Sequence, residues 1–411
     1  MVIINALMPF DESGFLGSVR ISNGLITQIA ASIMPEEGEE VIDAAGRWLL
    51  PGLVDLDCQA ARYLIKENLS TLLSQLAAGG ATTVLLQPDK ELKLTDPEML
   101  SMVTSTMASE DGVCVVQACQ ACDGERLNDL AILLDAGAAA ITTSSDIDSN
   151  LLLRSAQYAA MTEKPLIVAC NDSSLQGAGV MHEGAIAASM GLPGWPVVAE
   201  TAETARVIEI ARYTKATLWL RHLSCAISLQ LTKRAKAEGV QLAAGVHVHH
   251  LLLDESACEG FNTFAKTIPP LRSTKDREAL LQGVGEGSID YVSSGNVPVV
   301  EATKDVAFEV ASSGIESSSI FLPLLYTAVV VRGGMTMKDL VRVGAETPAR
   351  LLGLWDRGVL KEGLRADLIL FDPSLPSDPA LLPKGSPYAT YSLMGRVDAV
   401  WGGGRLLWGG K

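Results

Sequence analysis

The stretch "PGLVDLDCQAAR", residues 51–62, predicts a buried strand that ends in polar residues. Its short apolar run is typical of a parallel strand covered on both faces. The run leads into Asp57 and Gln59, and residues two apart on a strand point to the same side. The stretch is therefore expected to bring two polar side chains to one site.

Similar apolar runs recur along the chain, and helical segments separate them. One of these segments, Glu67–Ala78, places its leucines on one stripe and stops at two glycines. The expected strands are Leu53–Asp57, Thr82–Leu86, Val113–Ala118, Ala139–Thr143, Leu166–Cys170, Thr217–His222, Gln241–Val246 and Asp290–Ser294. Strands that alternate with helices in this way predict a (β/α)8 TIM barrel, over residues 51–355.

The two ends of the chain have a different pattern. Residues 1–50 and 356–411 contain short strands separated by turns, and neither end is long enough to build a sheet sandwich alone. Together they predict one small β-sandwich domain beside the barrel. Its expected strands are Val2–Ile4, Ser18–Ile21, Leu25–Ile29, Val41–Asp43, Leu368–Phe371, Val397–Trp401 and Arg405–Trp408.

Composition narrows the range of partners and compartments. The chain has 411 residues, of which 48% are hydrophobic, and a net charge of −16. An acidic surface repels phosphate, which argues against nucleic acid or an anionic membrane as a partner. The N-terminus lacks the basic start of a secretory signal, and the longest apolar stretch, Ile320–Val331, contains Pro323 and is too short to span a bilayer. We expect a cytoplasmic protein.

Seven cysteines are scattered along the chain, and an odd number without a secretory signal is typical of reduced thiols. Cys119 and Cys122 form a single CxxC motif. A zinc ribbon would need a second pair at a suitable spacing, and the sequence has none. The motif is interpreted as a loop after a strand, and the function of the pair stays open.

A barrel of this type carries its chemistry at the C-terminal ends of its strands. The polar residues expected there are Asp57, Gln59, Gln87, Asp89, Thr143, Ser144, Asn171, His222, His247, His249 and Asn296. His247 and His249 are expected to share one strand face and could bind one metal ion together.

The order of motifs resembles the dihydroorotase family of the amidohydrolase superfamily along nearly the whole chain. The matching stretches are "PGLVDL" (51–56), "AAGGATTV" (77–84), "MHEGAIAASMGLPGWP" (181–196), "HLS" (222–224), "HHLLL" (249–253), "PPLRSTKDREALL" (269–281) and "GLRADLILFDP" (363–373). The resemblance implies the same barrel with a sandwich domain built from both termini.

The residues that carry the chemistry of that family are mostly replaced here. The resemblance implies that Asp57 and Gln59 stand at its metal-binding His-x-His. Thr143 or Ser144 stands at its bridging carboxylate or carbamylated lysine. Ala169 stands at a further histidine, and Gly295 at the catalytic aspartate. Only His222 is kept. Asp89 stands near a neutral substrate-binding amide, Ala61 at an arginine, and Ile268 at an asparagine.

Zinc that hydrolyses a substrate needs about three protein ligands and an open position for water. Without them we expect no metal, with His222 as a remnant. The mouth is then a vestigial pocket formed by Asp57, Gln59, Asp89, Asn171, His222 and Asn296. An alternative keeps zinc at a displaced site formed by Asp57, His222, His247 and His249.

Two functions from different classes follow. The first is a structural subunit, because the sequence is similar to the inactive dihydroorotase-like chains that assemble with aspartate transcarbamoylase in some bacteria. This predicts that the chain binds the catalytic chain of that enzyme, in pyrimidine biosynthesis. It also predicts that the chain forms an oligomer, either with copies of itself or with its partner. The second is a hydrolase of cyclic amides with an altered or displaced metal site. A third reading, an ordinary dihydroorotase, would need a His-x-His near the first strand, and the chain has that spacing only at 247–249.

Overall fold

The computed structural model describes residues 1–60, 66–88, 95–101 and 112–409. Eight parallel strands form the barrel sheet, in the spatial order β17-β16-β15-β12-β11-β8-β7-β6. A parallel bridge between Cys58 and Asn296 joins the two ends of this order and closes the barrel. The strands are β6 (Leu53–Cys58), β7 (Ala81–Leu86), β8 (Cys114–Gln120), β11 (Ala140–Ser144), β12 (Leu166–Ala169), β15 (Leu218–Arg221), β16 (Leu242–His247) and β17 (Tyr291–Ser293).

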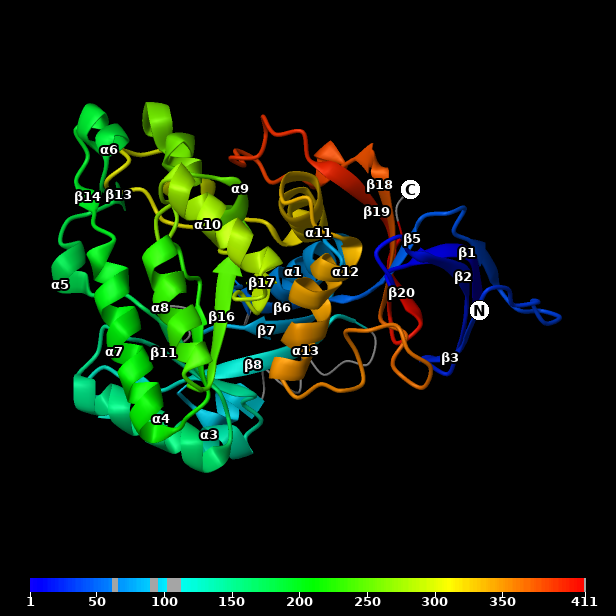
Figure 1. The fold of residues 1–411 in the computed structure, drawn as a ribbon, viewed down its shortest axis with the longest axis horizontal. Coiled ribbons are helices and arrows are strands. Elements are labelled where there is room, and N and C mark those ends of the chain that lie inside the picture. Colours follow the sequence, from blue (N-terminus) through cyan, green and yellow to red (C-terminus); the bar gives the residue numbers. More distant parts are fainter. Residues whose placement is uncertain (61–65, 89–94, 102–111, 410–411) are drawn as a thin grey trace.

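Helices surround these strands (Figure 1). The segment that was predicted from apolar spacing, Glu67–Ala78, forms α1 (Lys66–Ala78), and two further helices are α7 (Val198–Thr214) and α8 (Ala226–Ala237). The others are α3 (Leu130–Asp135), α4 (Ser149–Thr162), α5 (Ser173–Gln176), α6 (Ala185–Met190), α9 (His249–Leu252), α10 (Thr274–Gly285), α11 (Phe321–Tyr326), α12 (Met337–Val341) and α13 (Thr347–Leu351). Short two-residue pairs, β9 with β10 and β13 with β14, lie in the connections at Cys122–Asp123, Arg126–Leu127, Met181–His182 and Gly194–Trp195.

Both ends of the chain meet in a second sheet, which we call the terminal sheet (Figure 1, blue and red strands). Its order is β20-β19-β18-β5-β1-β2-β3, with β4 paired to β1. It is thus one continuous hydrogen-bonded path, in which β18 runs antiparallel to β5. The strands are β1 (Val2–Met8), β2 (Phe15–Ser22), β3 (Leu25–Ala30), β4 (Val41–Asp43), β5 (Trp48–Pro51), β18 (Leu368–Pro376), β19 (Met394–Gly402) and β20 (Arg405–Gly409).

The terminal sheet packs against the barrel and also holds a core of its own. Ile369 and Phe371 of β18 belong to the large apolar core outside the barrel strands. Leu368 and Leu370 belong instead to the core of the terminal sheet. The alternation along one strand therefore joins the two parts of the molecule.

The predicted architecture is confirmed, namely a barrel of eight strands with a sheet built from both termini. Strand β5 was not predicted. The division at residues 50 and 355 into separate domains stays a prediction. In the part of the chain that the structure describes, no helix is long and apolar enough to cross a bilayer.

Candidate functional site

Three charged or titratable side chains meet at the C-terminal end of the barrel, and we call them the mouth cluster: Asp57, Arg221 and His247. The guanidinium of Arg221 donates from Nε to Asp57 Oδ2 at 2.9 Å and from Nη2 to Oδ1 at 2.7 Å. His247 Nε2 lies 2.9 Å from Asp57 Oδ2. Both oxygens of the carboxylate are therefore occupied by a bidentate arginine, the strongest geometry for such a pair.

The strands of the barrel bring the mouth cluster together. Trp219 and Ala243 point into the central core of the barrel. Arg221 and His247 lie two and four residues further along the same strands, β15 and β16, and therefore point to the same side. Gln87, at the end of β7, accepts a bond from Arg221 Nη1 at 3.3 Å.

Three further histidines surround His247. The ring of His222 lies 5.2 Å from that of His247, and the rings of His249 and His250 lie 6.2 and 6.0 Å away. His249 Nδ1 meets the hydroxyl of Tyr388 at 2.7 Å, and its Nε2 lies 3.4 Å from the carbonyl oxygen of Gly295. His250 Nε2 lies 3.2 Å from the carbonyl oxygen of Pro269. His249 and His250 are thus held by neighbours outside the mouth cluster.

Burial and the guanidinium charge set the protonation of the mouth. Burial alone would raise the pKa of Asp57, but Arg221 and then His247 lower that pKa well below its usual range. Burial, followed by the positive charge of Arg221, keeps the pKa of His222 well below 6.5. Burial likewise lowers the pKa of His249 strongly and that of His250 to about 3. At neutral pH the site holds one carboxylate, one guanidinium and neutral imidazoles at 222, 249 and 250.

Position 295 is blocked by His247. A Cβ atom on Gly295 would lie 2.5 Å from His247 Cγ, and the φ angle of +63° disfavours any side chain. The resemblance places a catalytic aspartate here. With His247 where it is, no side chain fits at this position.

The other residues predicted for the vestigial pocket are distributed differently. Asn296 is buried, and its Oδ1 accepts bonds from the backbone N–H groups of Ser317 and Ser318. Its Nδ2 donates to the carbonyl oxygen of Gln59, which closes the barrel seam. Asn171 Nδ2 donates to Gln176 Oε1 in α5.

The other positions to which the resemblance points lie at strand ends or outside the described residues. Asp89, Ala61 and Arg62 lie outside the described residues. Ser144 and Ala169 end β11 and β12. Thr143 is buried, and its hydroxyl bonds the neighbouring backbone carbonyl of Ser144. None of these three side chains offers a carboxylate or imidazole to the mouth.

The mouth does not fit a zinc ion. Both carboxylate oxygens of Asp57 accept hydrogen bonds from Arg221. Both ring nitrogens of His249 are also engaged, one with the hydroxyl of Tyr388 and the other with the carbonyl oxygen of Gly295. A divalent cation about 4 Å from the guanidinium would be repelled by about 8 kcal/mol at an effective dielectric of 20. Among the described residues, no three His, Cys, Asp or Glu side chains are grouped so that they could hold a metal.

Sequence reasoning missed Arg221 and Tyr388. Arg221 directly precedes the retained His222 in "LWLRH", and a charged residue at the end of an apolar strand was a usable signal. Tyr388 comes from the connection between β18 and β19, which reaches the mouth from the terminal sheet. Nothing local in its sequence indicates that contact.

Both cysteines of the CxxC motif lie in strands. All seven cysteines are free. Cys119 lies inside β8 rather than in a loop, which corrects the prediction, and burial raises the pKa of its thiol to about 12. Cys122 lies in β9, with its sulfur 3.8 Å from Ser155 Oγ. Neither thiol is poised for nucleophilic or redox chemistry.

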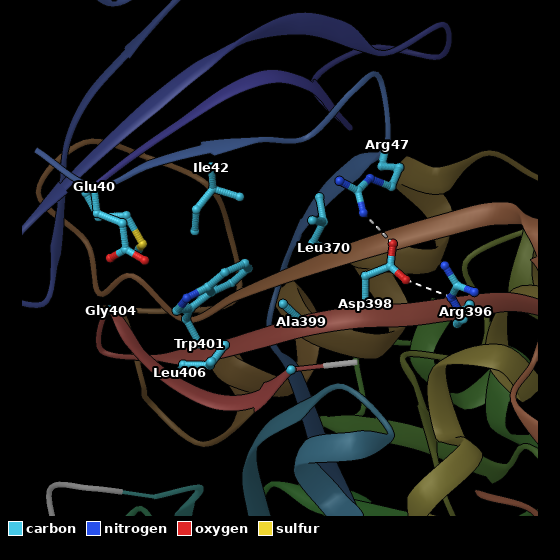
Figure 2. Close-up of a pocket in the computed structure, with 12 residues that line it drawn as sticks. Glu40, Ile42, Arg47, Leu370, Arg396, Asp398, Ala399, Trp401, Gly404 and Leu406 are labelled. Atoms are coloured by element: carbon cyan, nitrogen blue, oxygen red, sulfur yellow. Dashed lines mark hydrogen bonds and ion pairs between the residues drawn. The ribbon is translucent and has the colours of Figure 1, made fainter. Parts of the chain in front are cut away.

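A separate hollow opens on the terminal sheet (Figure 2). Its volume is about 530 Å³, and Ile42, Leu370 and Trp401 are among its lining residues. Figure 2 shows Asp398 between Arg47 and Arg396, which bind its two oxygens at 2.7 and 2.8 Å. The carboxylate of Asp398 is thus committed to internal ion pairs, and the hollow shares no lining residue with the mouth cluster.

Comparison with known proteins identifies relatives over the whole chain. A model of the family described as "Amidohydrolase family" matches residues 49–407. A protein named dihydroorotase from Ruminiclostridium cellulolyticum is 36% identical over 358 residues, 85% of this chain and 83% of the relative. A dihydroorotase from a Geobacillus species is 31% identical over 423 residues, 99% of this chain and 98% of the relative.

Solved structures share the fold. An L-hydantoinase from Arthrobacter aurescens superposes with a TM-score of 0.88 at 21% identity, over 100% of this chain and 96% of the other. A D-hydantoinase from a Thermus species gives 0.82 at 22% identity, over 98% and 94%. At these identities the likeness concerns the fold alone.

Proposed function

The chain belongs to the amidohydrolase family, and we propose that it is a dihydroorotase-like member without hydrolytic activity that serves as an assembly subunit. Its partner in this proposal is the catalytic chain of aspartate transcarbamoylase, in the de novo synthesis of pyrimidines. The partner rests on the resemblance to inactive dihydroorotase-like chains. The loss of activity rests on the mouth itself.

One observation carries the proposal: Arg221 forms a bidentate pair with Asp57 at the place where the resemblance puts a metal ligand. A guanidinium is permanently charged in proteins and cannot leave by losing a proton. It neutralises the buried carboxylate that would otherwise attract a metal cation. In this proposal the guanidinium of Arg221 takes the place of the metal cation beside Asp57.

The reacting groups of a hydrolase are also missing from the described mouth. Water activation needs a base within hydrogen-bond reach of the water. Position 295 is glycine and is covered by His247, while Asp57 is paired and has a strongly lowered pKa. A carboxylate with so low a pKa is a weak base. In this proposal the barrel fold is kept, while the side chains at its catalytic positions contact one another instead of a metal ion or a substrate.

The second candidate is a hydrolase of cyclic amides with a displaced metal. One observation favours it: His247 Nδ1 is buried and has no hydrogen-bond partner among the described residues. The ring of His222 lies beside that of His247, with 5.2 Å between their centres. The alternative requires that Arg221 swing away from Asp57 when the ion binds.

An activity assay separates the two candidates. The purified chain, supplied with zinc, is tested for hydrolysis and synthesis of dihydroorotate at pH 6–9, beside an authentic dihydroorotase. We expect no turnover above the uncatalysed rate. Zinc-dependent turnover by this chain would establish the second candidate in place of the first.

A binding assay tests the partner. The chain is mixed with the aspartate transcarbamoylase catalytic chain of the same organism at micromolar concentration and is analysed by size exclusion with light scattering. We expect one co-eluting complex whose transcarbamoylase activity exceeds that of the catalytic chain alone. Separate elution with unchanged activity would overturn the assembly role.

A further inference from the structure

Two buried lysines tie together two loops at the C-terminal end of the barrel. The first loop, residues 254–272, follows α9, and the second, residues 296–316, follows β17. Lys304 of the second loop donates to the carbonyl oxygens of Thr263 and Lys266 in the first, at 2.9 and 3.3 Å. Lys266 of the first loop donates to the carbonyl oxygens of Phe308 and Glu309 in the second, at 2.7 and 2.9 Å. We call these segments the stapled loops.

The burial of these two ammonium groups has an electrostatic cost. Neither ammonium group forms an ion pair with a described carboxylate, and burying an unpaired charge is costly. Burial, followed by the charge of Lys266, lowers the pKa of Lys304 to about 8. What the two lysines provide is a fixed geometry, because each bonds two carbonyl groups of the opposite loop.

The stapled loops expose apolar side chains as well as acidic ones. Five large hydrophobic side chains there are between 44% and 74% exposed: Phe261, Ile268, Val300, Val306 and Val310. Exposed hydrophobic side chains mark an interaction site when they lie close together on the surface. Beneath them Phe308 and Ala265 are buried, so that the loops have their own packed interior.

The exposed charges of the stapled loops have one sign. Lys266, Arg272 and Lys304 are the cationic residues of these two loops, and all three are buried. The exposed charged residues are acidic: Glu259, Glu301, Asp305 and Glu309. Glu301 pairs with Lys384, and the other three have no ion pair with a described residue. An apolar patch with acidic neighbours complements a surface with an apolar centre and basic neighbours.

We propose that the stapled loops form a preorganised docking surface for a protein partner that presents an apolar centre with a basic rim. The inference rests on the proposed function, in which that partner is the transcarbamoylase catalytic chain. Loops whose shape is already fixed lose little conformational entropy on binding, which favours association. The surface lies beside the replaced catalytic mouth, since β16 and β17 lead into both.

Exposed substitutions test this surface. The affinity for the transcarbamoylase catalytic chain is measured for the full-length wild type and for the Val300→Asp/Val310→Asp variant. We expect the variant to bind at least about tenfold more weakly, as for residues at the centre of an interface. Met161→Asp on α4 and Tyr213→Asp on α7 replace apolar residues that are equally exposed elsewhere, and they should bind like the wild type.

Two further variants test the charge and the staple. Asp305→Lys/Glu309→Lys should weaken binding and reduce its dependence on salt, because attraction to a basic rim is lost. Lys304→Met keeps the aliphatic part of the side chain but removes the ammonium group, and with it both hydrogen bonds to the first loop. It should weaken binding several-fold and speed amide exchange in residues 296–316, while Met161→Asp leaves that exchange unchanged.

The outcomes separate the docking surface from the assembly role. If the wild type binds the catalytic chain and the Val300→Asp/Val310→Asp variant binds equally well, the docking surface is wrong and the assembly role stands. If the wild type does not bind, the partner of the proposed function is wrong and the inference falls with it. If the substitutions dissolve an oligomer of this chain and leave partner affinity unchanged, the surface belongs to a second copy and the inference is overturned.

Discussion

Arg221 carries a permanent charge into the barrel, where Asp57 would otherwise be buried alone. Their side chains are 12% and 3% exposed. Removing one partner of a buried pair leaves the other uncompensated, which typically costs about 3–5 kcal/mol. Arg221→Met should therefore lower the free energy of unfolding by about that amount, measured by urea denaturation.

A matched ion pair on the surface gives the control for Arg221→Met. Arg234 of α8 pairs with Glu238, which directly follows that helix; both side chains are well exposed, and such pairs contribute about 0–1 kcal/mol. Arg234→Met should cost correspondingly little. Asp57→Asn combined with Arg221→Met should recover part of the loss. Equal costs for Arg221→Met and Arg234→Met would show that the mouth pair is not a buried, coupled pair.

Gly295 tests whether the catalytic position can be restored. Gly295→Asp forces a Cβ to within 2.5 Å of the His247 ring at a left-handed backbone position. We expect it to destabilise the fold by about 2–4 kcal/mol, from steric overlap and backbone strain, and to give no dihydroorotate turnover. His247→Gly in the same chain should relieve the overlap. A stable Gly295→Asp variant with turnover would contradict the proposed loss of the site.

The neutral histidines predict how stability changes with pH. The pKa values of His222, His249 and His250 are lowered in the fold, that of His250 to about 3. Below about pH 6.5 the unfolded chain binds protons that the folded chain does not, so stability falls as pH falls. Each histidine contributes up to about 1.4 kcal/mol per pH unit.

Urea denaturation between pH 7.5 and 4.5 measures this loss, and His250→Gln serves as the comparison. The substitution should reduce the steepness by the share of one histidine. A free energy of unfolding that stays constant from pH 7.5 to 5 would show that these imidazoles are not buried in neutral form.

At the scale of elements, helix α1 ends against the turn at residues 318–320. A Cβ on Gly79 would lie 1.8 Å from the backbone oxygen of Ser318, and backbone atoms cannot move aside cheaply. Gly79→Ala should cost about 1–3 kcal/mol or more, because the helix must shift. In Gly285→Ala on α10, the new methyl meets only Met335 Cε at 3.4 Å. That substitution should be neutral or stabilising by up to about 1 kcal/mol.

Thermal unfolding followed by circular dichroism measures both alanine variants. The difference between them isolates the contact of α1, because both replace a glycine near the end of a helix. Similar melting temperatures for the two variants would contradict the tight packing of α1 on residues 318–320.

The elements themselves were largely predictable from the sequence. The barrel strands are mainly apolar runs, and β6 differs from its predicted range by one residue. The short β5 was missed: only Gly52 separates it from β6, and the predicted strand began after that glycine, at Leu53. The pairing of Arg221 with Asp57 joins residues 164 apart in sequence and depends on the closure of the barrel, which no local pattern encodes.

At the scale of the molecule, strand β18 of the terminal sheet contributes side chains to two apolar cores. Ile369 and Leu370 are neighbours in sequence, yet each belongs to a different core. We therefore expect a single cooperative unfolding transition. Leu370→Ala, made in the terminal sheet alone, should lower that whole transition, as a cavity of this kind costs about 2–5 kcal/mol. Two separate calorimetric transitions, with only one shifted by Leu370→Ala, would contradict the shared core.

The binding of zinc tests the central claim most directly, namely that Arg221 and Asp57 occupy the position of the family's metal. The chain is produced in zinc-supplemented medium, dialysed against metal-free buffer and analysed by inductively coupled plasma mass spectrometry. An authentic dihydroorotase is treated in the same way. The pairing of Asp57 with Arg221 predicts far less than one zinc per chain. One firmly held zinc per chain would contradict it.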